Sequence, residues 1–218
     1  MPFAQFPRSV GLEERYGISF PSVAPDGSII GLQRGKPSES RVLRIARDGS
    51  ATPSSAPGQL SFATVSRDGR SVYGATPDAK IIEFPLTGDA SRATVRFEAG
   101  ARVWSIHPLT PERVVIAQSN RLQLLAIDGD SWRSLESVSV APVAIPMVDV
   151  LGGGRWVLVG KVPRIRLFAV IRDRLRVVQS WGPAEGMIAA DGRPFLPAPG
   201  TPDFLEVLSL DEVHAALS

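Results

Sequence analysis

Few side chains in this sequence have the chemistry that covalent catalysis needs. The chain has no cysteine and two histidines, His107 and His214. A nucleophilic triad needs a histidine beside a serine and an acid, but His107 stands before a proline in a turn-like HPLTPE segment and His214 stands in the C-terminal tail. We therefore predict no catalytic residues. The lack of cysteine also excludes disulfides, thiolate metal sites and thiol nucleophiles.

A glycine run is the next candidate for chemistry, because glycine-rich loops can hold phosphate groups. Gly152, Gly153 and Gly154 are followed by Arg-Trp-Val in a β-type run. Phosphate-binding and dinucleotide-binding loops instead lead into a helix and have other glycine spacings. We interpret the run as a tight turn between strands and predict no cofactor.

A basic run at residues 155–176 is the most unusual local feature. It carries a single acid, Asp173, and its cations are Arg155, Lys161, Arg164, Arg166, Arg172, Arg174 and Arg176. Residues two apart in a strand share a face. We therefore expect two short basic rows, Arg164 with Arg166, and Arg172 with Arg174 and Arg176. Such rows either protect a sheet edge or attract an acidic partner, and we place an acidic protein surface ahead of nucleic acid.

Aromatic and arginine side chains near predicted loops are candidates for partner contacts, because Trp, Tyr and Arg dominate binding hot spots. Trp104 and Trp156 fall inside predicted strands, where we expect core positions. Trp132 and Trp181 stand at a predicted outer strand and a turn, so we expect partial exposure. The binding candidates on one loop-bearing face are Tyr16, Arg34, Lys36, Arg102, Lys161, Arg164 and Trp181.

The elements that must position these residues are short β-strands. Residues 64–88 form three β-type runs, separated by an Asp68-Gly69 turn and a Pro77-Asp78 turn. Turns of this type between β-branched and aromatic runs indicate an antiparallel meander. The 20 glycines and 19 prolines are spread along all 218 residues, which also favours many short strands.

The meander recurs at a nearly constant step. Runs with apolar first and fourth positions begin at residues 42, 81, 122, 165 and 205, a mean spacing near 41 residues. A turn recurs in phase before the second run of each copy. Fourth segments follow at residues 50–53, 93–99, 132–139 and 175–181. Four short antiparallel strands per repeat of this length are typical of a β-propeller blade.

We therefore predict an all-β fold that is one five-bladed β-propeller over residues 1–218. Solenoid repeats are shorter, and a sandwich has no reason to repeat at a constant step. We expect residues 2–9 to pair as the outer strand of the fifth blade and close the ring, which removes an open edge. The predicted blades span residues 17–53, 60–99, 101–139, 143–181 and 186–212.

The phase of these units and their Pro-Asp-Gly turns resemble the loose group of bacterial propellers that includes YncE-like, NHL and gluconolactonase-like families. The Trp-Asp and Gly-His pairs of WD40 repeats are absent. Gluconolactonase-like enzymes hold a metal in the central channel with Glu, Asn and Asp ligands and hydrolyse lactones there. The resemblance implies Glu14, Asp149 and Glu185 as the acids that could converge on such a metal, whereas Asn120 is the single asparagine.

Charge and hydropathy exclude further classes of function. A formal net charge of +2 does not indicate nucleic-acid binding, and no run approaches 18 apolar residues, so we expect no membrane span. The N-terminus lacks the pattern of a signal peptide, so we expect a cytoplasmic protein. We predict a non-enzymatic protein–protein interaction module, a scaffold or a toxin-neutralising partner. The alternative is a metal-dependent, lactonase-like hydrolase with its site in the central channel.

Overall fold

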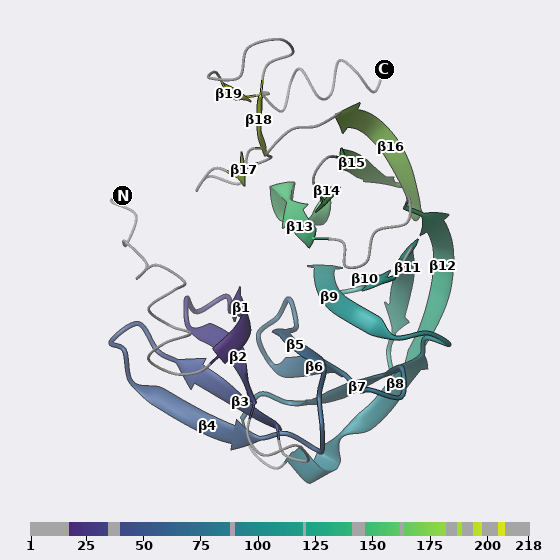
Figure 1. The fold of residues 1–218 in the computed structure, drawn as a ribbon. Helices are drawn as coiled ribbons and strands as arrows, with labels where there is room; N and C mark the ends of the chain where they lie inside the picture. Colours follow the sequence, from purple (N-terminus) through teal and green to yellow (C-terminus); the bar gives the residue numbers. More distant parts are fainter. Residues whose placement is uncertain are drawn as a thin grey trace. The chain divides into compact units, whose positions relative to one another are not determined.

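The computed structural model describes residues 18–34, 40–87, 90–119, 121–140, 147–161, 164–181, 187–188, 194–197 and 205–207. The chain divides into two compact units, Met1–Ile106 and His107–Ser218. The described strands form antiparallel sheets in which sheet neighbours are also neighbours in the chain (Figure 1). Among the described residues, no helix is long and apolar enough to cross a membrane.

The first unit contains two four-stranded sheets. The first sheet has the strands β1 (Ile18–Val23), β2 (Ile29–Arg34), β3 (Ser40–Ile45) and β4 (Ala51–Ser55). The second sheet has the strands β5 (Phe62–Val65), β6 (Ser71–Ala75), β7 (Lys80–Pro85) and β8 (Thr94–Glu98), with a short 3-10 helix η1 (Ala90–Arg92) before β8.

The second unit begins within the first strand of the third sheet. That sheet has the strands β9 (Val103–Thr110), β10 (Arg113–Gln118), β11 (Arg121–Asp128) and β12 (Ser131–Ser139). The fourth sheet has β13 (Met147–Leu151), a 3-10 turn η2 (Gly152–Gly154), β14 (Trp156–Lys161), β15 (Arg164–Ile171) and β16 (Arg174–Trp181). The fifth sheet has the described strands β17 (Met187–Ile188), β18 (Pro194–Pro197) and β19 (Leu205–Val207).

The repeat that the sequence predicts is confirmed strand by strand. The apolar third runs are β3, β7, β11, β15 and β19, and the fourth segments are β4, β8, β12 and β16. The all-β prediction with four-stranded antiparallel sheets therefore holds. Residues 2–9, predicted to add a strand to the fifth sheet, lie outside the described residues.

The core of the first unit lies between its two sheets. Ile30, Leu32 and Val42 of the first sheet belong to one buried cluster with Val72 and Phe84 of the second. Strand alternation produces this packing, because every second side chain of a strand points to the same face. Two backbone N–H groups donate across the same junction: Leu60 to the Ser40 hydroxyl at 2.9 Å and Val65 to the Ser22 hydroxyl at 3.4 Å.

The core of the second unit repeats this arrangement between the third and fourth sheets. Val115 and Leu124 of the third sheet cluster with Val157 and Phe168 of the fourth. Gly154 brings the two backbones together, because an added Cβ would lie 2.1 Å from the Leu109 carbonyl oxygen. The triple glycine is thus a tight turn, as predicted, and its last residue is a packing contact.

The Asp-Gly turns fold through local hydrogen bonds. Asp26 Oδ1 accepts the amide of Ser28 at 2.9 Å and its hydroxyl at 2.6 Å, and Asp48 accepts the same two groups of Ser50 at 2.8 and 2.7 Å. Such bonds mimic a backbone turn. The glycine after Asp26 has φ +81°, a left-handed conformation that costs glycine little. These turn sequences therefore determine where each hairpin reverses.

We predict that Asp26 contributes acid-sensitive stability. The Ser28 hydroxyl and amide, followed by Arg44, lower the pKa of Asp26 from 3.8 to about 2. A depressed folded-state pKa means that this stabilisation is present above about pH 4 and is lost as the pH falls toward 2. Asp26→Asn keeps the Oδ1 acceptor but cannot titrate. Its urea midpoint should therefore fall less than that of wild type between about pH 5 and about pH 2. Asp130→Asn is the control, and equal slopes for wild type and Asp26→Asn would contradict the prediction.

Gly154→Ala should destabilise the second unit much more than Gly153→Ala. Both glycines have positive φ, +94° and +66°, but only the first meets the Leu109 carbonyl, whereas nothing lies within 4 Å of a Cβ at Gly153. We expect roughly 3 kcal/mol for Gly154→Ala, from overpacking added to backbone strain, against about 1 kcal/mol for strain alone. Chemical denaturation measures both changes. Equal losses would show that the backbone contact has no energetic weight.

Candidate interaction site

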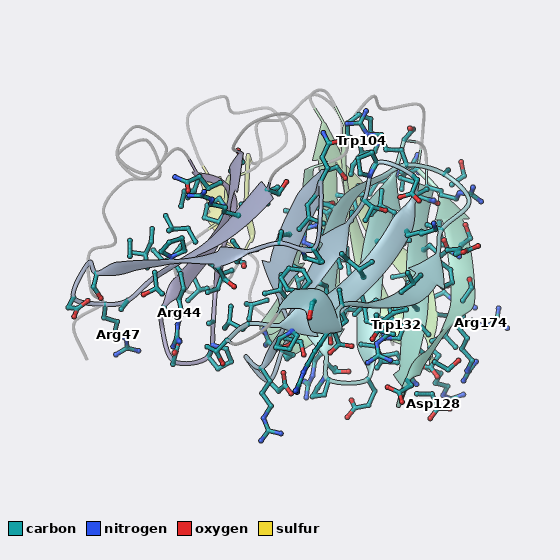
Figure 2. The ribbon with its side chains drawn as sticks, turned by 90° about the horizontal axis from the view of Figure 1, so that it is seen from below. Arg44, Arg47, Trp104, Asp128, Trp132 and Arg174 are labelled. Carbon is teal, nitrogen blue, oxygen red and sulfur yellow. The ribbon has the colours of Figure 1, made fainter. Side chains whose placement is uncertain are left out.

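An arginine stacked on a tryptophan marks the connection between β8 and β9. The Arg102 side chain is exposed, and its Cζ lies 4.1 Å from the centroid of the Trp104 ring. Trp104, labelled in Figure 2, is the second residue of β9. It is half-buried and stands between the buried residues Val103 and Ser105. A stack of this kind contributes about 0.5–1 kcal/mol at an exposed site. It holds a normally mobile arginine in one place.

This pair places hydrogen-bond donors beside an apolar surface. The guanidinium presents up to five N–H donors in a planar fork that suits a carboxylate, and the indole supplies a rigid apolar surface beside it. The sequence singled out Arg102 but assigned Trp104 to the core. Trp104 stands between the buried residues Val103 and Ser105, so its side chain points to the opposite face of β9 from theirs, where it is only half-buried.

The burial of Trp156 agrees with the sequence-based expectation, whereas that of Trp132 does not. Trp156 is buried in β14, as predicted. Trp132 was expected to be partly exposed because it starts an outer strand, but its exposed fraction is only 6%. It pairs in register with Ile127, and an outer strand still directs alternate side chains inward.

Of the two basic rows that the sequence predicts, the first stands in β15, where Arg164 and Arg166 are two residues apart, and the second is altered. Arg172 and Asp173 form the turn between β15 and β16, with φ +48° and +63°. Arg172 therefore leaves the expected row, and Arg174 and Arg176 alone remain on β16. Two consecutive residues with positive φ are typical of the turns that match strand twist. Arg166, inside β15, is half-buried.

The single acid of the basic run is already paired. Arg113 Nε donates to Asp173 Oδ1 at 2.6 Å and Arg113 Nη2 donates to Oδ2 at 2.8 Å. This bidentate contact lowers the pKa of Asp173 and raises that of Arg113. It joins β10 to the β15–β16 turn within the second unit. Sequence reasoning missed it because the two residues are 60 positions apart.

Four predicted binding residues lie at strand ends beside connections. Lys161 ends β14 and faces Arg164 in register, while Trp181 ends β16 and pairs with Ile165. The register of the fourth sheet therefore places Lys161, Arg164 and Trp181 at one end of its strands. Arg34 likewise ends β2, opposite Ser40. Tyr16 and Lys36 lie outside the described residues.

The acids and histidines have the following places. Asp149 lies in β13, opposite Leu158, whereas Glu14, Glu185 and His214 fall outside the described residues. Within the described part of the chain, no group of three or more His, Cys, Asp or Glu side chains could hold a metal ion. His107 lies inside β9 rather than in the predicted turn, and burial lowers its pKa to about 4.

Comparisons with known proteins show the fold. No protein-family model and no curated protein matches this sequence. A functionally unknown protein from Desulfotomaculum acetoxidans is similar in structure, with TM-score 0.64 and 14% identity, covering 89% of this chain and 69% of that one. A putative 6-phosphogluconolactonase from Bacteroides uniformis has TM-score 0.59 and 12% identity, covering 87% and 68%.

A third similar structure is a β-propeller domain. The β-propeller domain of Cps50 (Swd1) from Myceliophthora thermophila has TM-score 0.57 and 16% identity, covering 87% of this chain and 69% of that one. At sequence identities this low, structural similarity shows the fold but does not show the activity or the partners. With its repeated four-stranded antiparallel sheets, the chain is an all-β protein whose fold is loosely similar to that of β-propellers.

Proposed function

We propose that this chain is a non-enzymatic module that binds another protein, as a scaffold or as a toxin-neutralising partner. The observation that carries this proposal is the Arg102–Trp104 stack at the β8–β9 connection. Loops on a rigid sheet scaffold are common binding elements, and Trp and Arg are the side chains most enriched in interface hot spots. An arginine already held by an aromatic ring loses less side-chain entropy on binding.

The binding surface is the end of the sheets where such connections lie. In an antiparallel meander, the connections from the second to the third strand emerge at the same end as the connection to the next sheet. In the second unit Lys161, Arg164 and Trp181 stand at that end of the fourth sheet. In the first unit Arg102 stands in the connection that follows the second sheet. We propose that Tyr16 and Lys36 belong to the same surface.

We further propose that the scaffold is a closed ring of five blades. Four sheets have four strands each, whereas the described fifth sheet ends at β19 after three. Residues 2–9 supply the fourth strand in this proposal. Closure would remove an edge that could otherwise pair with another chain.

A metal-dependent lactonase-like hydrolase is the second candidate. Its support is the similarity in fold to the putative 6-phosphogluconolactonase. Such a site would draw on Glu14, Asp149 and Glu185, of which Asp149 lies in a described strand. The described residues show no cluster able to hold a metal, so we rank this candidate second.

Ring closure predicts that deleting residues 2–9 lowers the melting temperature by roughly 5–10 °C, because the edge of the fifth blade would lose its backbone hydrogen bonds. Deleting residues 211–218, a segment of equal length at the other end, is the control. Differential scanning calorimetry measures both variants. Equal melting temperatures for wild type and the first deletion would remove this closure from the proposal.

The interaction role predicts that Arg102→Glu reduces the recovery of a specific partner about tenfold or more, because a hot-spot arginine typically contributes at least ~1.4 kcal/mol to binding. Affinity capture followed by quantitative mass spectrometry measures this recovery. Arg121→Glu is the matched control, since it makes the same charge change at an exposed position of β11. Equal recovery with both variants would contradict the proposal. A stoichiometric divalent ion together with lactone hydrolysis that Asp149→Asn abolishes would favour the hydrolase.

A further inference from the structure

Two arginines on the outer strand of the fourth sheet share one carboxylate. Arg174 and Arg176 stand two residues apart on β16, and their side chains are 63% and 54% exposed. Their Nη1 atoms lie 4.0 and 3.7 Å from the same atom, Oε1 of Glu136 on β12. Both distances exceed those of a hydrogen bond. The guanidinium groups are therefore gathered by Glu136 but keep their N–H donors for another acceptor.

The Glu136 side chain also accepts a hydrogen bond from the backbone. Its side chain is only 17% exposed, and its other oxygen, Oε2, accepts the amide of Leu175. Among these three side chains one positive charge remains uncompensated. Asp173, the nearest acid in sequence, does not supply the missing charge, because Arg113 holds both of its oxygens.

The edge of β16 is poorly suited to strand addition. β16 pairs on one side with β15, and that pairing shifts register between Leu167 and Phe168, which leaves Val178 as an extra residue. A bulge of this kind interrupts the ladder that a new strand would extend. The Leu175 amide is also occupied by Glu136. A partner at this surface must therefore bind through its side chains.

An exposed apolar neighbour indicates what kind of anion fits. Ile171 pairs in register with Arg174, so it lies on the same face of the sheet, and it is 41% exposed. A small free anion or a nucleic-acid backbone would leave this side chain in water. A peptide that carries carboxylates beside apolar side chains would satisfy the arginines and cover the apolar surface as well.

We propose that Arg174 and Arg176, positioned by Glu136, form a docking site for an acidic, partly apolar segment of a partner protein. This inference rests on the proposed binding role but assigns it a second site, on the outer strands of the second unit and separate from Arg102. Carboxylates of the partner bridge the two guanidinium groups. Ile171, on the same face as Arg174, contacts its apolar side chains.

The test uses the full chain and a fluorescein-labelled peptide of alternating Glu and Leu, with binding followed by fluorescence anisotropy. Arg174→Glu/Arg176→Glu should weaken binding about tenfold or more, and Arg174→Gln/Arg176→Gln should weaken it by a smaller factor. Glu136→Gln should weaken binding about threefold, because the carboxylate that gathers the two guanidinium groups is lost while the amide oxygen can still accept the Leu175 amide. Unchanged binding would show that Glu136 does not position the two arginines.

Matched controls distinguish binding at Arg174 and Arg176 from an effect of the protein's net charge and from binding at Arg102. Arg67→Glu/Arg121→Glu changes the net charge equally and should bind the peptide as wild type does, and so should Arg102→Glu. A peptide of alternating Lys and Leu should recover binding to the doubly reversed variant. The proposal is overturned if Arg67→Glu/Arg121→Glu weakens binding as much as Arg174→Glu/Arg176→Glu does. It is overturned too if an uncharged peptide of alternating Gln and Leu binds as well as the peptide of alternating Glu and Leu. It is also overturned if pyrophosphate or a DNA duplex competes at the same charge concentration. If Arg102→Glu loses cellular partners while this peptide still binds, the two sites are independent.

Discussion

The fold depends on one packing constraint: each antiparallel meander has an apolar face that a single sheet cannot bury. In the first unit that face is covered by the next meander, with Ile30 and Leu32 packed in one cluster with Val72 and Phe84. In the second unit Leu124 and Phe168 belong to the equivalent cluster. Burying apolar surface contributes roughly 25 cal/mol per Å². A short repeat that cannot bury its own face must therefore stack on a neighbour.

The outer strands show how such a scaffold avoids unwanted pairing. β8, β12 and β16 each carry a register shift that leaves one extra residue, Arg96, Leu135 and Val178 respectively. β4 has no such shift, but Pro53 stands inside it, and proline removes a backbone donor. These features discourage edge-to-edge association. Recognition is thus left to side chains at connections and on strand faces.

Arginine is the main cationic side chain of this protein, and its arginines differ in the partners that they contact. Arg113 forms a bidentate pair with Asp173 and Arg96 pairs with Glu83, and both contacts hold strands in place. Arg102 is held by an indole ring instead of an acid. Arg174 and Arg176 share one carboxylate. The arginines held in place with donors to spare are the ones suited to binding, since a preorganised side chain loses less entropy.

The sequence by itself determined the strands, the turns and the repeat, because their causes are local. Asp26 and Ser28 are two residues apart and Ser66 and Asp68 likewise, so the residues that form a turn are visible as a short pattern. Only the tertiary structure decided which side chains meet. The Arg113–Asp173 pair spans 60 positions and the Glu136–Leu175 contact spans 39. The exposed fractions of Trp104 and Trp132 likewise depend on how other parts of the protein cover these side chains. A periodic sequence pattern does not contain that information.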